Sequence, residues 1–413
     1  MAGVTVASMR LLHTSDWHLG RTLHGVDLLE HQAAHLDHLV ELTRSEGVDA
    51  VLVAGDVYDR AVPPVEAVTL LSETLARLAE RAIVIVTSGN HDSAIRLGFG
   101  AGLMRAGVHL RTRVSDVALP VVLSPRGAGS VGADDDGVVL AYGLPYLDPD
   151  VVRRELSGSR SEPLARSHEA VTRAAMDRVR ADLAARTAVA AASGAPRPRA
   201  VVLAHAFVLG GEASESERDI RVGGVDHVPA GIFAGMDYVA LGHLHGPQRI
   251  SGPAGTVLRY SGSPLAYSFS EVHQVKSSVL IDVGPGGVVG EPRLISAPVP
   301  RRVAELTGTL EQLLGPAGEA HVADWLHVVV TDAARPAELY ARVKHRFPYA
   351  LVVQHRPPAA AGERAHVVVT SARDPLEVAA EFVQHVTAAE PTDAEAGALR
   401  AALERVVALE RSA

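Results

Sequence analysis

The chain has 413 residues, 47% of them hydrophobic, and contains no cysteine. It is long enough for a large core and two or three domains, and the lack of cysteine excludes disulfides, thiolate ligands and thiol nucleophiles. The formal net charge of −9 is not that of a protein that coats nucleic acid through bulk electrostatics. There is no signal-peptide pattern and no apolar run of about eighteen residues, which favours a soluble, cytoplasmic protein without a membrane span.

The first part of the chain alternates apolar, β-branched runs with segments of helical periodicity. The predicted strands are 9–14, 49–54, 82–87, 108–112, 117–123 and 138–143. The predicted helices are 28–46, 65–80 (opened by two prolines) and a short one at 93–104. This order indicates a layered α/β architecture.

Polar motifs follow the first three of these strands. Asp16 and His18 follow the first strand, Asp56 follows the second after a glycine, and Asn90-His91-Asp92 follows the third. Such side chains are the oxygen and nitrogen ligands expected for Mn, Fe or Zn. Strand ends of one open sheet converge on one cleft. Alone, each motif has a simpler interpretation, such as an Asp that caps a helix or lies in a turn.

The middle of the chain supplies three more histidines. A helix at about 162–187 and a connector at 191–198 precede strand 200–204, which delivers His205. Strand 238–242 leads to His243 and His245, whose alternation places both on one side of an extended segment. The acidic, Ser/Gly-rich stretch 210–224 is predicted to be a mobile loop. Further strands are predicted at 247–250, 256–260 and 277–283.

Pro298 and Pro300 mark a predicted domain boundary. Beyond them, a strand at 326–330, a helix at 336–346 and strands at 350–354 and 365–370 indicate a small α+β domain. Two final helices are predicted at 375–389 and 393–409, the second with an apolar stripe. The predicted domains are therefore 1–297, 298–372 and 373–413.

The five motifs together carry a family resemblance. The order D-x-H, G-D, G-N-H-D, H and G-H-x-H is that of the calcineurin-like metallophosphoesterases. Within them, the chain resembles the SbcD family of bacterial DNA-repair nuclease subunits. The residues that carry this closer resemblance are 12–20, 53–59, 87–93 and 260–264. The resemblance covers essentially the whole chain and is thinner in the C-terminal third.

The resemblance implies a layered two-sheet metallophosphoesterase core with a small α+β capping domain and C-terminal helices. It also implies two divalent metal ions, with Mn²⁺ preferred. Asp56 would bridge them. The first ion would be held by Asp16, His18 and His245, and the second by Asn90, His205 and His243.

The neighbouring motif residues are the candidates for catalysis. Adjacent residues in a tight turn do not easily ligate one ion in the same way, so with Asn90 on the metal, His91 is free to contact the phosphate or protonate the leaving oxygen. Asp92 would either orient His91 or cap the following helix, and the two interpretations are about equal. The role of Asp59 is open, since some relatives carry His there. Two ions about 3.5–4 Å apart clamp both oxygens of an in-line displacement by water.

The resemblance also supplies substrate and partners. It implies a 3′→5′ double-strand DNA exonuclease and single-strand or hairpin endonuclease. The chain would act with an SbcC-type, SMC-like ATPase, as a homodimer formed through its N-terminal helices within a heterotetramer. The C-terminal helices would bind that ATPase; the alternative is that their apolar stripe packs on its own domain. There is no Walker A segment, so any ATPase must be another chain.

Two other functions stay open at this point. One is a phosphomonoesterase or cyclic-nucleotide phosphodiesterase that uses the same metals, and the other is a scaffold with an inactive site. Among the remaining residues, His31, His35 and His38 have helical spacing and are predicted to form a partly solvated face rather than a metal site. His13 is predicted to be structural. Three arginines near the motifs are either phosphate contacts or surface charges: Arg21, Arg60 and Arg96.

Overall fold

The computed structural model describes residues 8–104, 107–124, 138–159, 161–217, 227–358, 375–387 and 390–410. The chain divides into two compact units, Met1–Pro357 and Pro358–Ala413. Within the described ranges, no helix combines the length and apolar character that crossing a bilayer requires.

The first sheet of the larger unit has six strands in the order β16-β15-β1-β4-β5-β6. Strands β1, β4, β5 and β6 run parallel, and β15 and β16 are antiparallel to their neighbours. Helices α1 (Leu29–Ser45) and α2 (Val65–Ala79) connect the first parallel strands. The strands are β1 (Met9–Thr14), β4 (Ala50–Ala54), β5 (Ile83–Thr87), β6 (Val108–Arg111), β15 (Ser277–Gly284) and β16 (Gly287–Ser296).

The second sheet also has six strands, in the order β13-β14-β12-β9-β8-β7. Its central strands β14, β12, β9 and β8 are parallel. Helices α4 (Pro149–Ser157) and α5 (His168–Ser193) lie between β8 and β9 in the chain. The strands are β7 (Val121–Leu123), β8 (Val139–Gly143), β9 (Arg199–His205), β12 (Tyr238–Gly242), β13 (Gln248–Ile250) and β14 (Val257–Tyr260).

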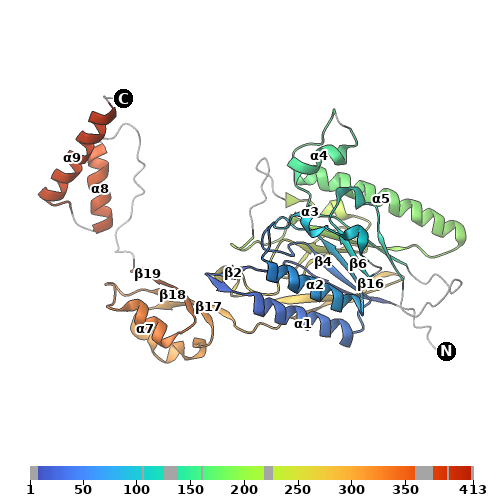
Figure 1. Cartoon of the computed structure of the whole chain (residues 1–413), viewed down its shortest axis with the longest axis horizontal. Helices are drawn as coiled ribbons and strands as arrows, with labels where there is room; N and C mark the ends of the chain where they lie inside the picture. The colour runs from blue at the N-terminus through green and yellow to red at the C-terminus, as the bar shows by residue number, and fades with distance from the viewer. Residues whose placement is uncertain are drawn as a thin grey trace. The chain divides into compact units, whose positions relative to one another are not determined.

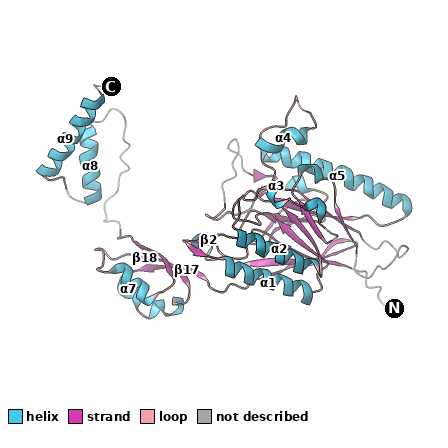
Figure 2. Ribbon diagram, viewed as in Figure 1, coloured by secondary structure: helices cyan, strands magenta, loops and turns pink. Residues whose placement is uncertain are grey.

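The two sheets pack face to face between two helical layers (Figures 1 and 2). In β4, Val51 and Val53 face α1 and α2, whereas Ala50 and Leu52 enter the core between the sheets. In β9, alternate residues likewise pack toward α5 or toward the other sheet. Strands with two buried faces read as continuous apolar runs, which is the pattern of these segments. The predicted layered, two-sheet α/β fold is confirmed.

A small parallel sheet follows the core in the chain. It consists of β17 (Val303–Gly308), β18 (Trp325–Val330) and β19 (Ala350–His355), covered by α6 (Leu310–Leu314) and α7 (Leu339–Arg346). Trp325 packs against residues of the core, joining the two parts: Leu23, Leu28, Leu265 and Tyr267. In the second unit, α8 (Pro375–Thr387) and α9 (Asp393–Glu410) contact each other.

Short elements complete the described chain. They are β2 (Thr22–Leu23), β3 (Val26–Asp27), β10 (Phe207–Val208), β11 (His227–Val228), α3 (Ala94–Leu97), and 3-10 turns at Ala101–Leu103, Val114–Asp116, Ala230–Phe233, Phe269–Glu271 and Pro316–His321.

Several predicted elements need correction. The helix predicted at 93–104 is a four-residue helix followed by a separate 3-10 turn, because Gly98 and Gly100 interrupt it. The helix predicted at 162–187 begins at His168, capped by Ser167, and runs on to Ser193. Helix α4 and strands β16 and β17 were not predicted. The strand predicted at 365–370 lies outside the described residues.

Candidate metal centre

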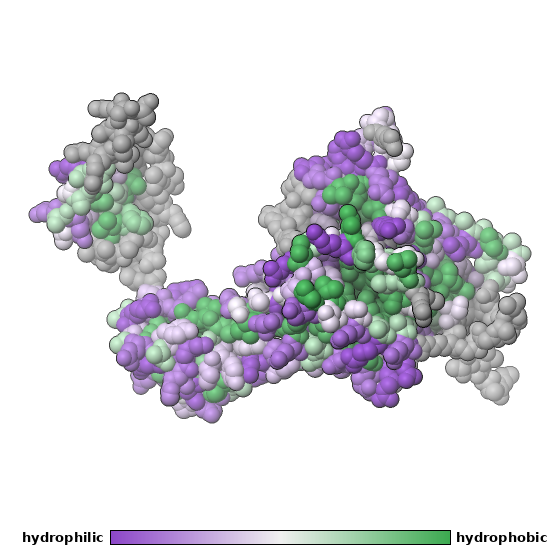
Figure 3. All heavy atoms as spheres, viewed as in Figure 1, coloured by the Kyte–Doolittle hydropathy of each residue, from purple (hydrophilic) through white to green (hydrophobic). Residues whose placement is uncertain are grey.

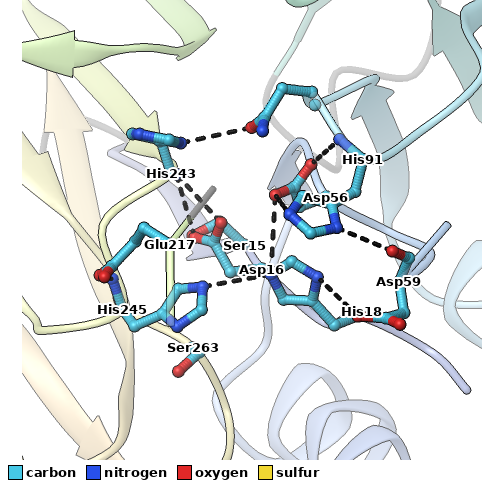
Figure 4. Close-up of polar contacts among 12 residues, drawn as sticks. Ser15, Asp16, His18, Asp56, Asp59, His91, Glu217, His243, His245 and Ser263 are labelled. Carbon is cyan, nitrogen blue, oxygen red and sulfur yellow. Dashed lines mark hydrogen bonds and ion pairs between the residues drawn. The ribbon is translucent and has the colours of Figure 1, made fainter. Parts of the chain in front are cut away.

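The predicted ligands come from the carboxyl ends of strands in both sheets and meet at one place (Figure 4). Asp16 and His18 follow β1, and Asp56 follows β4. Asn90 follows β5. His205 ends β9 in the second sheet, and His243 and His245 follow β12. The site therefore lies where the two sheets meet, at the edge that the strand polarity predicts.

The backbone at this place is strained. Four of the predicted ligands have positive φ: Asp16 (55°), His18 (45°), Asp56 (48°) and His243 (105°). Non-glycine residues rarely adopt this region, and where they do the surrounding structure must hold them. Here the Asp16 amide donates to the Gly55 carbonyl (3.1 Å) and the His18 amide to the Asp56 carbonyl (3.0 Å). The turns after β1 and β4 are thus tied together.

The motif glycines allow the closest approaches. A β-carbon on Gly242 would lie 1.9 Å from the Ala54 carbonyl oxygen, and one on Gly89 would lie 2.1 Å from Asp56 Oδ1. Because these glycines have no side chain, the Ala54 main chain can approach Gly242 and the Asp56 carboxylate can approach Gly89.

The first ligand group is Asp16, His18 and His245. Their donor atoms lie within 4.8 Å of one another, and all three residues are buried. The Nε2 atoms of His18 and His245 face each other at 3.1 Å. On the far side of the His245 ring, Nδ1 lies 3.2 Å from Glu271 Oε1 and donates toward it, which leaves the Nε2 lone pair directed into the site. Two ring nitrogens and a carboxylate in this arrangement fit a divalent cation.

The second group is Asp56, Asn90, His205 and His243. Asn90 Oδ1 lies 2.9 Å from His205 Nε2 and 3.3 Å from His243 Nδ1. His205 Nδ1 donates to the Ala54 carbonyl (3.0 Å), so its Nε2 is the ring nitrogen that faces the site. Asp56 Oδ2 lies 3.6 Å from His18 Nε2 and 3.4 Å from His205 Nε2. This carboxylate oxygen is therefore positioned between the two groups, as a bridging ligand requires.

Burial and mutual charge shift the pKa values of these groups. Burial raises the pKa of Asp16 to about 6. Burial opposes ionisation of Asp56 as well, but the adjacent His205 holds its pKa well below the usual range. Burial would lower the pKa of His205, yet the Asp56 carboxylate raises it to about 9. Burial lowers the pKa values of His18 and His243 well below normal. Both are therefore neutral at pH 7, the form that binds metals.

His91 lies beside both groups. Its amide donates to Asp56 Oδ1 (2.9 Å), and its Nδ1 donates to the Asp59 carbonyl (2.7 Å). Its Nε2 lies 4.0 Å from Asp56 Oδ2, on the site side of the ring. The orienting contact on the imidazole thus comes from the Asp59 main chain.

Asp92 holds the backbone of the site together. Its carboxylate accepts from the amides of Gly89 (2.9 Å), Val57 (3.1 Å) and Tyr58 (2.9 Å). The following helix is capped by Ser93, so of the two interpretations of Asp92 the helix cap is wrong. Burial, together with Asp56, raises the pKa of Asp92 to about 7. Asp92 joins the turn after β5 to the turn after β4.

Part of the stretch predicted to be a mobile loop contacts the site. Ser216 Oγ lies 2.6 Å from His245 Nδ1, and Glu217 accepts from the His245 amide (2.8 Å). The mobility of this stretch stays a prediction, and residues 218–224 lie outside the described range. Sequence reasoning missed Ser216, Glu217 and Glu271, because no local motif marks them.

The three arginines near the motifs differ in burial and in their contacts. Arg21 is largely buried, lies over the Tyr267 ring (4.9 Å) and donates to the Ser216 carbonyl (3.0 Å). Its Nη1 lies 3.6 Å from the Asp59 carboxylate, which itself lies 3.8 Å from His18 Nδ1. Arg60 is exposed, and the exposed Arg96 donates to the Ala61 carbonyl.

Two histidine predictions have different outcomes. His31 and His38 are partly exposed, with His31 also packed against Trp325 (5.1 Å between rings), whereas His35 is buried. The predicted partly solvated face is therefore found at His31 and His38 but not at His35. His13 bonds Tyr238 (2.9 Å) and the Leu241 carbonyl (3.2 Å) across the two sheets, in agreement with a structural role.

Comparison with known proteins decides the family. Residues 9–247, more than half of the chain, match the calcineurin-like phosphoesterases, and residues 299–387 match the type 5 capsule protein repressor C-terminal domain. The chain belongs to the calcineurin-like phosphoesterase family. It is 39% identical over 285 residues to the SbcD subunit of nuclease SbcCD from Bacillus subtilis (strain 168), covering 67% of each protein.

Solved structures are more distant. GAP50 of Plasmodium is 10% identical (TM-score 0.41), with 70% of this chain and 84% of that chain covered. A dimetal phosphatase from Danio rerio is 12% identical (TM-score 0.37), with 70% and 99% covered. Family membership makes the chain a calcineurin-like phosphoesterase, an enzyme that hydrolyses phosphate esters with divalent metal ions.

Proposed function

We propose that this phosphoesterase is the nuclease subunit of a DNA-repair complex and hydrolyses phosphodiester bonds at DNA ends, as a 3′→5′ double-strand exonuclease and a single-strand or hairpin endonuclease. The observation that carries the proposal is the pair of ligand groups joined by Asp56, with His91 at their edge. The similarity to the SbcD subunit of nuclease SbcCD supports DNA as the substrate.

The first ion would be held by Asp16, His18 and His245 and the second by Asn90, His205 and His243, with Asp56 between them. When bound, the two ions supply charge neutralisation for the phosphate and activation of water. Their oxygen and nitrogen donors suit Mn²⁺. Because Mn²⁺ adds positive charge at the site, a chain of net charge −9 can still bind a phosphodiester there.

His91 is the group that would handle the leaving oxygen. Donation from its Nδ1 to the Asp59 carbonyl fixes the ring, so Nε2 can carry a second proton toward the site. The Arg21 guanidinium lies near the first ligand group and would contact a phosphate oxygen of the substrate.

The test is cleavage of a blunt, end-labelled duplex and of a hairpin with Mn²⁺. Each is measured with and without the SbcC-type ATPase and ATP, for the native chain and for His91→Ala. We expect metal-dependent cleavage that the ATPase stimulates. His91→Ala should abolish it while still binding two ions, since His91 is not among the proposed ligands.

The same experiment separates the other functions. Hydrolysis of a small phosphodiester without any DNA cleavage would favour a cyclic-nucleotide phosphodiesterase or phosphomonoesterase. DNA binding without hydrolysis of any ester would favour a scaffold with an inactive site.

Two surfaces suit the proposed partners. Exposed hydrophobic side chains gather near α2 and α3, on the face seen in Figure 3. They are Val62, Val65, Ile95, Phe99 and Leu103. Two copies of the chain would meet through this patch to form the homodimer within the heterotetramer. Such an exposed patch is typical of an interface.

Helices α8 and α9, with Phe382 exposed, would bind the SMC-like ATPase. Phe99→Asp should give a monomer in sedimentation, and Phe382→Ala should weaken ATPase capture.

A further inference from the structure

Lys276 is a buried lysine next to the candidate metal centre. It is one of only two lysines among 39 basic residues, and its side chain is 3% exposed. Its Nζ donates to the His245 carbonyl (3.0 Å), to Ser263 Oγ (2.9 Å) and to Gln274 Oε1 (2.7 Å). It also forms an ion pair with Glu271. A buried ammonium is tolerated only with such complete pairing.

Glu271 connects this ammonium to a proposed ligand. One carboxylate oxygen contacts Lys276, and the other accepts from His245 Nδ1 at 3.2 Å. Ser216 also donates to Glu271 and contacts the same ring nitrogen. Lys276 therefore holds His245 at two points. It binds the main-chain carbonyl directly and the imidazole through Glu271.

This arrangement determines which ring nitrogen is available. With Nδ1–H donating to Glu271, Nε2 of His245 faces His18 Nε2 within the first ligand group. A carboxylate behind a metal-binding histidine fixes the tautomer and raises its basicity. No equivalent carboxylate is described behind His205, whose Nδ1 is bonded by the Ala54 main chain.

We propose that Glu271 and Lys276 are positioning residues for the first metal ion, acting through His245 and leaving the second ion's ligands unaffected. The inference rests on the proposed two-metal centre. It adds that the two metal sites differ in what supports them. In the first site, His245 is held by a buried side-chain ion pair, whereas in the second site His205 is held by main chain.

The test measures metal binding to the full-length chain, separately from catalysis. Lys276→Met removes the charge at similar length, and Glu271→Gln removes the charge while keeping the shape. Ser263→Ala is the matched control, because it removes one Lys276 contact but leaves the Glu271–His245 pair. Mn²⁺ stoichiometry and affinity come from calorimetry. Electron paramagnetic resonance distinguishes a coupled pair of Mn²⁺ ions from a single one.

We expect the native chain and Ser263→Ala to bind two ions and show a coupled signal. In Lys276→Met, the first site should weaken by about 10- to 100-fold, with the second site unchanged and a single-ion signal at intermediate Mn²⁺. Glu271→Gln should show the same site-selective loss, which covers the case in which Lys276→Met does not fold.

Three outcomes would overturn the inference. Native-like binding of both ions in a folded Glu271→Gln variant would show that the pair does not support His245. Equal weakening of both sites would show a general structural role only. If the native chain itself bound fewer than two ions, the proposed metal centre would fail, and the inference would fail with it.

Discussion

Gly242 is a position of close approach between the two sheets, and Gly242→Ala tests that contact. Gly242 ends β12 and pairs with His205 at the end of β9. A β-carbon there would lie 1.9 Å from the Ala54 carbonyl oxygen and 2.9 Å from His205 Nδ1. Ala54 ends β4 in the other sheet, and its carbonyl accepts the hydrogen bond from His205 Nδ1. One methyl group would therefore disturb both the sheet contact and the second ligand group.

The magnitude follows from these distances. To lengthen the contact from 1.9 Å to the 3.0 Å below which β-carbons essentially never approach, the strand ends must part by about 1.1 Å. Overpacking of this kind costs about 1–3 kcal/mol, and weakening the buried His205–Ala54 hydrogen bond adds about 1 kcal/mol. We expect the free energy of unfolding to fall by about 2–4 kcal/mol. We also expect Mn²⁺ affinity to fall more at the second site than at the first.

The assay is urea unfolding of the metal-free chain together with Mn²⁺ calorimetry. Gly231→Ala is the matched control, because a β-carbon on Gly231 meets nothing within 4 Å. If Gly242→Ala unfolded like the control and bound both ions normally, the close approach of the sheets would not constrain the site, and the reasoning would be refuted.

Three further predictions concern other parts of the molecule. Asp92→Ala removes the acceptor of three buried amides, so unfolding free energy should fall by about 2–4 kcal/mol; unchanged stability with a large loss of kcat would instead show a direct catalytic role. Because Asp56 raises the pKa of the metal-free His205 to about 9, Mn²⁺ binding at pH 7.5 should release about one proton. This proton release should vanish above pH 9. It is measured as a dependence of the calorimetric heat of Mn²⁺ binding on the ionisation heat of the buffer, and a heat that is the same in all buffers at pH 7.5 would contradict the prediction. Trp325→Ala empties the apolar contact between the small sheet and the core, so proteolysis near 298–300 should accelerate while the core stays folded, and an unchanged cleavage rate would count against that contact.

The elements with the clearest local pattern were predictable from sequence. The strand bounds of β1, β4, β5, β9 and β12 lie within one residue of those predicted. These strands are buried on both faces, so they appear as short apolar runs that end at a polar motif. The motif residues themselves converge because parallel strands bring their carboxyl ends to one edge. Sequence reasoning thus reaches the seven proposed ligands and His91.

Elements whose stability depends on distant contacts were not predictable. Strand β16 is mostly exposed, so its residues show no apolar run. The contacts of Glu271 and Ser216 with His245 span 26 and 29 residues. For Lys276, the only feature of the sequence that marked the residue was the rarity of lysine in an arginine-rich chain. Such contacts arise from the packing of separate segments, which single-sequence periodicity does not record.

The conformations of the ligands lie furthest from any sequence rule. Of the six non-glycine residues with positive φ in the described chain, four are proposed ligands. Each costs about 1–2 kcal/mol relative to ordinary backbone, so together they amount to about 4–8 kcal/mol, comparable with the net stability of a whole domain. The hydrogen bonds between the turns after β1 and β4, and the contacts of Asp92, hold the conformations of Asp16, His18 and Asp56. Four of the residues that the sequence marks as ligands therefore have backbone conformations that non-glycine residues rarely adopt. The His243 amide donates to Asp16 Oδ1 across the two sheets (3.0 Å), so the ligand conformations depend on contacts between strand ends that lie far apart in the chain.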